Sequence, residues 1–405
     1  MGASLPAHAE EGPHPNPPPE YREREQYKER GPEKREGAFR YDLATPADDA
    51  DVRRLLRESP MGDPVSVSLE REPDASIAAA VEGDVHHTIV ARDRVTGDLA
   101  AVGAVSVRGA YVNGQVTRLG YLGQLRLARA YQGHASLLRG GYAFLRRLHE
   151  STGAGLYLTS IFSGNRRARR FLERGLTGMP TYRPLESFET LVMPVVRRAD
   201  VPPGGTVRKN INREPGDIVD CLNRNGPRYQ LSPAWTREEL ERFGRIGNLR
   251  PTDFHYATPR GHEVKGCMAV WDQRAFKQVI VRGYSKALAW ARPVINLAGP
   301  LIGTGPLPAV GEQLDMAYVS HVAVDDDDPE VFAALLRSAH AHAWARGIKY
   351  LTLGFAWRHP LLPVAKNLFR HRRTVSTLYA VHWEDGADAA AQLDGRVVHY
   401  EVALL

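Results

Sequence analysis

The sequence predicts an α/β (α+β) protein made of two tandem units, each a mixed, mostly antiparallel sheet flanked by helices. Segments of alternating apolar residues are interleaved with segments of helical spacing, and the order of these segments recurs in the second half of the chain. A chain of 405 residues also exceeds the usual size of one domain. We expect a tail at 1–37, a first unit at 38–196, a linker at 197–214 and a second unit at 215–405.

The tail is rich in Pro, Glu, Arg and Lys and has few aliphatic side chains, so it cannot offset the entropy lost on ordering and is expected to be disordered. The first unit then opens with a strand at 39–45, and Val52, Leu55 and Leu56 follow at helical spacing. Further elements of this unit are strands at 65–69, 87–92, 99–108, 155–161 and 182–195, and helices at 76–81 and 165–173. Turn signals between the early strands predict an antiparallel meander.

The stretch from Tyr121 to Glu150 joins an alternating strand to a helix through a short turn. Leu119, Tyr121, Leu125 and Leu127 share one parity of the strand, and the leucines after residue 136 return every three or four residues. Between them lie small or polar residues, Gln132, Gly133, His134, Ala135 and Ser136. Free backbone N–H groups and the positive end of the helix dipole at this point favour an anion such as a diphosphate.

The second unit repeats this order. Its predicted elements are helices at 218–222, 235–243 and 330–346, strands at 254–257, 263–271, 314–324 and 350–355, and a Pro/Gly-interrupted region at 290–311. The interval from Leu156 to Tyr350 is about 194 residues and that from Tyr121 to Tyr318 about 197, which indicates a diverged internal duplication.

Composition excludes several classes of protein. The net charge of +6 is a small excess of 53 basic over 47 acidic residues that are well mixed along the chain, which argues against a nucleic-acid binder. Two cysteines, Cys221 and Cys267, support neither a disulfide framework nor a zinc site. Neither a signal peptide nor a run of about 18 apolar residues is present, so we expect a cytoplasmic protein without a membrane segment.

Residues Ala130 to Ala135 and Asn165 to Gly175 resemble the GNAT superfamily of N-acyltransferases. The family motif Q/R-x-x-G-x-G/A is matched at Gly133 and Ala135, whereas Ala130 stands where the family has Gln or Arg. Asn165, followed by Ala168, Phe171 and Gly175, is similar to the family's next helix. The resemblance covers both units and implies that acyl-CoA binds the first one, at Leu125, Leu127, Gln132, Gly133, His134, Ala135, Ser136 and Asn165. Asn165 is equally explained as an N-cap.

In the second unit Asp325, Asp326, Asp327 and Asp328 replace the phosphate turn. Four carboxylates repel a diphosphate and no glycine allows close approach, so an acyl-CoA site is not expected in this unit. A metal site made of this run with His340 and His342 is not predicted, because four consecutive loop residues do not all converge on one ion.

The catalytic residues are less well defined. The family's base position falls near Tyr121, which we take as the catalytic candidate; it would orient water, because a base of pKa about 10 is protonated at neutral pH. Gln124 lies on the other parity, where it binds substrate or faces solvent. Phe171 and Leu172 occupy the region of the family's tyrosine acid. The second unit offers Tyr318, Ser320, His321 and Glu312 instead.

The predicted function is transfer of an acetyl or other acyl group from acyl-CoA to a primary amine of a small molecule or a protein. Two alternatives stay open. One is an aminoacyltransferase of the FemX type, and the other is a non-catalytic acyl-CoA sensor, which the missing acid and base would suit. No nucleic-acid or membrane partner is expected, no metal is predicted, and a homodimer is left open.

Overall fold

The computed structural model describes residues 37–201, 207–209, 215–258, 263–302 and 305–405. The predicted tail, apart from Gly37, and most of the predicted linker lie outside these ranges. The strands of the first half are β1 (Phe39–Leu43), β2 (Val65–Glu70), β3 (Val85–Asp93), β4 (Leu99–Val112), β5 (Gln115–Leu127), β6 (Leu156–Phe162) and β7 (Thr181–Pro194). Those of the second half are β8 (Val207–Lys209), β9 (Ser232–Pro233), β10 (Phe254–Ala257), β11 (Gly266–Trp271), β12 (Gln278–Tyr284), β13 (Met316–Val324), β14 (Tyr350–Ala356) and β15 (Arg372–His382).

The helices are α2 (Asp49–Arg57), α3 (Ala75–Glu82), α4 (Ala135–Thr152), α5 (Arg166–Leu172), α6 (Pro215–Asn225), α7 (Arg237–Ile246), α8 (Lys286–Ile302), α9 (Pro329–Ala345), α10 (Leu361–Leu368) and α11 (Ala387–Ala391). In the part of the chain that the structure describes, none of the helices has the length and apolar character needed to cross a bilayer.

One sheet of 13 strands runs through both halves, in the order β1-β3-β4-β5-β6-β15-β7-β14-β13-β11-β10-β8, with β9 paired to β4. Within this sheet the ladders are antiparallel except at β5·β6 and β13·β14. Strands β2 and β12 form a separate antiparallel pair. The predicted fold class, a mixed and mostly antiparallel sheet flanked by helices, is confirmed.

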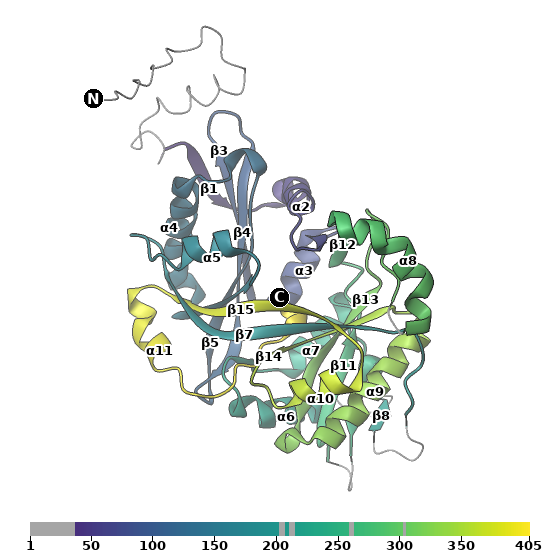
Figure 1. Ribbon diagram of the computed structural model, residues 1–405. Coiled ribbons are helices and arrows are strands. Elements are labelled where there is room, and N and C mark those ends of the chain that lie inside the picture. Colours follow the sequence, from purple (N-terminus) through teal and green to yellow (C-terminus); the bar gives the residue numbers. More distant parts are fainter. Residues whose placement is uncertain (1–36, 202–206, 210–214, 259–262, 303–304) are drawn as a thin grey trace, which may run out of the picture.

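Helices cover both faces of the sheet in each half. In the first half α4 lies on one side of β3 and β4, and α2 and α3 lie on the other (Figure 1). In the second half α9 packs on Met268 and Val270 of β11, whereas α6 and α7 share a core with Cys267 and Ala269. Successive residues of a strand point to opposite faces, so these helix groups also lie on opposite faces.

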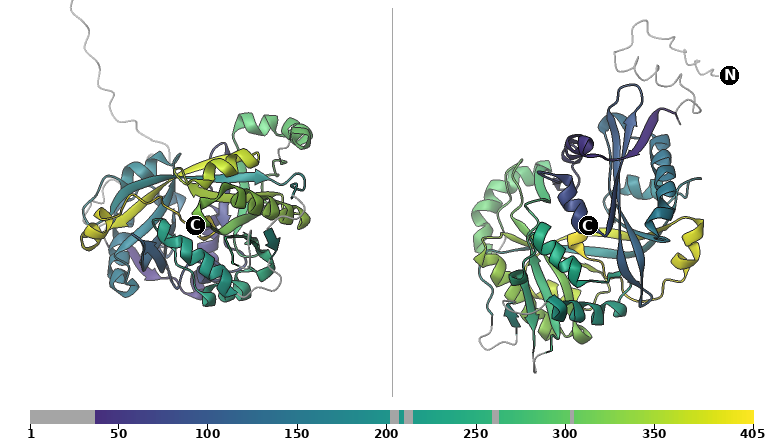
Figure 2. Two further views of the ribbon diagram at one scale, coloured as in Figure 1. Left: turned by 90° about the horizontal axis from the view of Figure 1, so that it is seen from below. Right: turned by 180° about the vertical axis from the view of Figure 1, so that it is seen from behind.

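The two halves exchange their last strands. Strand β15 lies between β6 and β7, and β7 in turn pairs with β14, so each half completes the sheet of the other. Figure 1 shows β7 and β15 side by side across the middle of the molecule, and Figure 2 shows the same arrangement from behind. The division of the chain into units that end at residue 196 and begin at residue 215 therefore stays a prediction, because one sheet includes strands from both sides of it.

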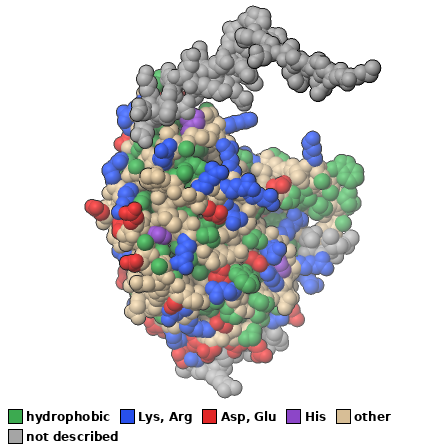
Figure 3. Space-filling model, turned by 60° about the vertical axis from the view of Figure 1, so that its left-hand side comes forward, with side chains coloured by type: hydrophobic (Ala, Val, Ile, Leu, Met, Phe, Trp, Pro, Cys, Tyr) green, Lys and Arg blue, Asp and Glu red, His purple; other side chains and the backbone are tan. Residues whose placement is uncertain are grey.

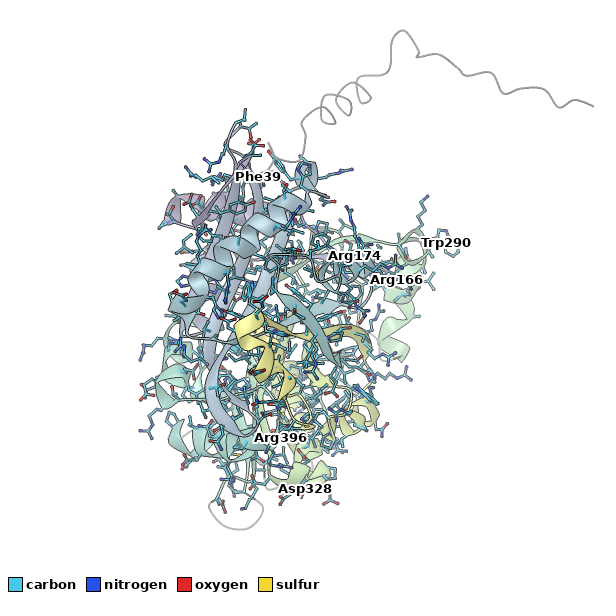
Figure 4. All side chains as sticks on the ribbon, turned by 90° about the vertical axis from the view of Figure 1, so that its left-hand side faces the viewer. Phe39, Arg166, Arg174, Trp290, Asp328 and Arg396 are labelled. Carbon is cyan, nitrogen blue, oxygen red and sulfur yellow. The ribbon has the colours of Figure 1, made fainter. Side chains whose placement is uncertain are left out.

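Residues 290–311, described above as interrupted by Pro and Gly, contain more helix than that composition indicates. Most of this stretch belongs to α8, which continues through Pro293. A proline removes the N–H that would bond the carbonyl of Ala289, but Ala289 is exposed and water can satisfy that carbonyl. Trp290, Val294 and Leu297 on this helix are also exposed. Figure 3 shows the resulting apolar patch at the right-hand edge of the molecule, and Trp290 stands out at that edge in Figure 4.

Candidate functional site

Strands β5 and β6 separate at the centre of the sheet. They pair in parallel from Leu119 to Tyr121, opposite Leu156 to Leu158, and the ladder stops there. Three residues further along, Gln124 adopts a positive φ of 57°, and the register against β4 shifts at this point. This β-bulge bends β5 away from β6, so beyond Tyr121 this backbone edge of β5 pairs with no strand among the described residues.

The bulge also changes which side chains share a face. Leu122 packs with Tyr142 and Leu145 of α4, and Leu127, five residues later, packs with Leu137 of the same helix. Leu125 is 40% exposed. Tyr121 therefore does not share a face with Leu127, and the single parity expected for Leu119 to Leu127 was wrong because the extra residue reverses the alternation.

The Gln124 side chain lies on the face of Tyr121. Its Nε2 donates to Glu82 Oε2 over 3.2 Å. Without the bulge the alternation of the strand would have placed this amide on the face of α4. The local kink thus brings Gln124 and the carboxylate of α3 together.

The turn before α4 has the geometry of an anion site. After the 3₁₀ turn η3 (Arg129–Tyr131), Gly133 takes a φ of +95°, His134 occupies the N-cap, and α4 begins at Ala135. A Cβ on Gly133 would lie 3.4 Å from Nη2 of Arg167 on α5. The 18-residue helix thus directs its positive end toward a turn that also carries a guanidinium group.

The other predicted binding residues surround this turn. Gln132 is exposed, whereas Ala135 and Ser136 form the partly buried start of α4. The His134 ring packs edge-on against Phe39 and Tyr131. Asn165 Oδ1 accepts the N–H of Ala168 over 3.1 Å, which is the N-cap role.

Basic residues extend from the turn along α5. Arg166, Arg167, Arg170 and Arg174 are exposed, and Arg169 Nε donates to Tyr379 Oη over 2.9 Å. Figure 4 shows Arg166 and Arg174 on the same side of the molecule, and Figure 3 shows Lys and Arg side chains gathered on this face beside the apolar patch. The face suits a polyanionic ligand.

A buried polar cluster lies on the other face of β5, where the two halves meet. Arg71 Nη2 pairs with Glu82 Oε1 at 3.1 Å. Burial raises the pKa of Glu82, but Arg71 and Lys277 outweigh this effect, so the net pKa lies below its usual value and the carboxylate stays ionised. Tyr121 stacks on Tyr400, with ring centroids 5.3 Å apart. Burial and Glu82 raise the pKa of Tyr121, so this residue keeps its proton at neutral pH.

Strands β13 and β14 repeat the separation seen in β5 and β6. They pair from Met316 to Tyr318, the bulge follows at His321 with a φ of 52°, and the register against β11 shifts there. The intervals to the corresponding residues of β5 and β6 are those noted in the sequence, about 197 and about 194 residues. We call the separation of β5 from β6 beyond Tyr121 the first gap, and that of β13 from β14 beyond Tyr318 the second gap. The two gaps are built on the same backbone pattern.

The second gap is filled by the chain itself. The segment Tyr400–Leu405, which we call the plug, includes the 3₁₀ turn η8 (Val402–Leu404) and contacts both β13 and β14. Glu401 Oε2 accepts the N–H of His321 over 2.7 Å, and a Cβ on Gly354 would lie 2.8 Å from Val402 Cβ. His321, at the bulge, is only 1% exposed.

Lys277 holds the plug in place. Its Nζ donates to the main-chain oxygens of Ala403 over 3.0 Å and Leu405 over 2.7 Å. Burial and the nearby Arg71 lower the pKa of Lys277 to about 7. Burial raises the pKa of Glu401 to about 7.

The acidic run before α9 is occupied by protein contacts. Arg224 and Lys265 pair with Asp325, Arg228 and Tyr229 contact Asp327, and Asp328 caps α9. His340 stacks on Phe369, while His342 lies beside His255. Across the described ranges, no three His, Cys, Asp or Glu side chains are grouped to hold a metal ion.

The four residues expected from the second half fall in different places. Tyr318 lies near the central cluster, where burial raises its pKa and the Lys277 Nζ stands 5.9 Å from its ring. Ser320 Oγ and His321 Nδ1 are 2.9 Å apart, and burial lowers the pKa of His321 to about 3. Glu312 instead lines a separate cavity of about 180 Å³ beside α8.

Sequence reasoning missed Arg71, Glu82 and Lys277, whereas Arg167 is one of the four arginines after Asn165 that could reach the cofactor's phosphates or form a solvated basic face. None of these three belongs to a local motif, and both Arg71 and Glu82 precede the strand β5 by more than 30 residues. The parity change at Gln124 places this side chain on the face of β5 that carries Tyr121. The residue types around a bulge give no clear signal of it, so the sequence does not predict this placement.

Comparisons with known proteins agree with this architecture. No protein-family model matches the chain, and no characterised protein matches it by sequence. Among solved structures, Saccharomyces cerevisiae N-myristoyltransferase with bound myristoyl-CoA is similar at a TM-score of 0.56 and 13% identity, covering 85% of this chain and 83% of that one. A GCN5-related N-acetyltransferase from Sphaerobacter thermophilus is similar at a TM-score of 0.50 and 13% identity, covering 84% and 95%.

A third similar structure is the GCN5-related glucosamine N-acetyltransferase region of a fungal multi-domain GH3 beta-N-acetylglucosaminidase, at a TM-score of 0.54 and 14% identity, covering 85% of this chain and 38% of that one. At these identities the likeness concerns the fold. The chain has the fold of the GNAT-superfamily acyltransferases, which confirms the resemblance carried by the strand, turn and helix around Gly133.

Proposed function

We propose that the protein is an N-acyltransferase that moves an acetyl or other acyl group from acyl-CoA to a primary amine. One observation carries the proposal. The first gap combines a separated strand pair, a positive-φ glycine at the start of an 18-residue helix and an arginine beside that glycine. A thioester arm fits the free strand edge, and its diphosphate fits the turn.

The solved structures that share this fold include one with bound myristoyl-CoA and others described as N-acetyltransferases. They support acyl-CoA as the co-substrate in general. We propose acetyl as the acyl group to test first. A long-chain acyl group is the alternative.

In the proposed reaction the amine nitrogen attacks the thioester carbonyl, a C–N bond forms and the C–S bond breaks. Main-chain N–H groups along the free edge of β5 polarise the carbonyl as its oxygen gains charge. Glu82 takes the proton that the amine loses, because it is the ionised carboxylate hydrogen-bonded to the bulge residue Gln124. The leaving thiolate is protonated by solvent. Tyr121 serves to orient the amine or a water, since its raised pKa rules out a role as base.

Isothermal calorimetry of the full chain with acetyl-CoA, myristoyl-CoA and free CoA tests the proposal. We expect one site per chain, with affinity retained by free CoA because the diphosphate is the main anchor. Release of free thiol with a panel of primary amines then separates an enzyme from a sensor. Absence of binding by all three ligands would refute the proposed function, and binding without thiol release would favour the sensor.

A further inference from the structure

Arg126 carries a positive charge that no carboxylate neutralises within the described ranges. Its guanidinium Nη1 donates to the neighbouring Leu125 carbonyl over 2.9 Å, and Nη2 lies 4.0 Å from the sulfur of Met61. Its Nε is buried and has no hydrogen-bond partner. Burial and the nearby Arg71 lower the pKa of Arg126 to about 10, so it remains charged at neutral pH. Arg126 is half-buried, and a half-buried guanidinium without a carboxylate partner favours a carboxylate or phosphate ligand.

Arg71 is the second guanidinium of this region, and its charge is only partly used. It is 5% exposed, and Nη2 binds Glu82, but Nε is buried without a partner and Nη1 makes a long 3.4 Å contact to the Glu70 carbonyl. The Glu70 carboxylate itself pairs with Arg57 and Arg282. Glu82 is therefore the carboxylate that serves this part of the cluster.

Both guanidinium groups lie on the acceptor side of the proposed site. The bulge puts Arg126 on the face of β5 that carries Tyr121 and Gln124, opposite the face covered by α4. Arg71 and Arg126 both act electrostatically on Tyr121. An anion bound here would lie beside the thioester position and away from the Gly133 turn, which is reserved for the diphosphate.

From this arrangement we infer that the acyl acceptor is an amine that also carries a carboxylate or a phosphate, and that Arg126 and Arg71 bind this anion. The inference rests on the proposed function, because it names the acceptor class of the same site. A charged hydrogen-bonded partner at a desolvated site changes affinity by roughly 10- to 100-fold. Anionic amines are therefore expected to exceed their neutral amides by at least about tenfold in kcat/KM.

The test uses the full chain with matched sets of acceptors. Each set holds an ω-amino acid of two to six carbons, its carboxamide and the corresponding aminoalkyl phosphate, and the readout is thiol release from acetyl-CoA. A preference for the acid or for the phosphate identifies the source of the anion. Equal or better turnover of the carboxamides would overturn the inference while leaving the proposed function intact.

A binding readout keeps the test independent of turnover. Calorimetry with the N-acetylated acids, phosphates and carboxamides is expected to show tighter binding of the anions by about tenfold or more. If acetyl-CoA, myristoyl-CoA and free CoA all fail to bind, the proposed function fails, and the calorimetry still decides whether the arginine pair holds an anion. No preference for the anions overturns the pair as an anion site.

Variants of Arg126 assign the effect to this residue. Arg126→Gln should abolish the anion preference and leave acetyl-CoA affinity within about twofold, whereas Arg126→Lys, which keeps the charge and guards against misfolding, should retain part of it. Arg40→Gln, at an exposed arginine paired with Asp42, is the control. Loss of acetyl-CoA binding in Arg126→Gln equal to the loss for the acceptor would place Arg126 in the cofactor site and overturn the inference.

Discussion

The strand pairs beside the two gaps have corresponding registers, but the residues around the two gaps differ. In the first, the residue after the bulge, Leu125, is 40% exposed and the turn before α4 carries Gly133 and Arg167. In the second, the bulge residue His321 is buried and its N–H donates to Glu401 of the plug. The turn before α9 carries four aspartates. The proposed ligand site lies at the first gap, whereas the plug fills the second.

This difference shows how two similar backbone arrangements can be completed in different ways. A free strand edge is costly when it is buried without hydrogen-bond partners. The plug satisfies that requirement in the second half, where Glu401 accepts the N–H of His321. In the first half, the proposed thioester arm would meet it.

The largest expected effect comes from introducing a negative charge at the turn beside the first gap. Gly133→Glu places a side chain on a residue with a φ of +95° and a carboxylate at the proposed diphosphate turn. We expect acetyl-CoA affinity to fall by about 100-fold or more in calorimetry. Gly311→Glu, at a second-half glycine with a φ of +90° and no neighbour within 4 Å of its Cβ position, is the matched control. Equal losses in both variants would contradict the assignment of the first gap.

The next effect concerns chemistry in the first half. Glu82→Gln removes the proposed proton acceptor and keeps a hydrogen-bonding side chain of the same size, so kcat should fall by about 100-fold. Acetyl-CoA affinity should change little, because Glu82 lies on the face away from the turn. Steady-state kinetics of wild type, Glu82→Gln and the exposed control Glu58→Gln measure this. A fall in cofactor affinity without a fall in kcat would show that the carboxylate is not the base.

A third effect concerns the plug, through Lys277. The folded pKa of Lys277, about 7, lies below the ordinary lysine value of 10.5, so the unfolded chain binds more protons between these two pH values. The free energy of unfolding of the wild type should therefore rise with pH through this window, whereas Lys277→Met lacks the rise. Between pH 6 and pH 9 the wild type should gain on the order of 2 kcal/mol relative to the variant in urea denaturation. A pH-independent difference between the two proteins would contradict the buried, titrating lysine.

The smallest effect concerns the arginine beside the turn. Arg167→Ala removes the guanidinium that approaches Gly133 and should weaken acetyl-CoA binding by about tenfold in calorimetry. Arg174→Ala, at the exposed position beyond the end of α5, should change affinity by less than about twofold if its charge acts only through solvent. Similar losses in the two variants would mean that α5 acts as a general positive field and that Arg167 has no specific contact.

Part of this picture follows from residue patterns. The strands, the helices and the turn at Gly133 are local features, because periodicity, turn residues and a helix start are written in neighbouring residues. The repeated intervals between Tyr121 and Tyr318, and between Leu156 and Tyr350, reproduce the register of the two strand pairs.

Other features depend on contacts that sequence distance conceals. Glu82 meets Gln124 only because a bulge reverses the parity of β5, and Lys277 meets Leu405 across more than a hundred residues. The role of Tyr121 illustrates the same limit. Its position was predicted, but its raised pKa comes from burial against Tyr400 and from Glu82, which no local pattern indicates.

The exchange of β7 and β15 ties the two halves into one cooperative unit. Removing the second half would take away the strand that shields β6, and removing the first would leave an edge of β14 unpaired. Neither half would therefore keep a complete sheet if it were produced alone, because the hydrogen bonds that complete each half are made by a strand of the other.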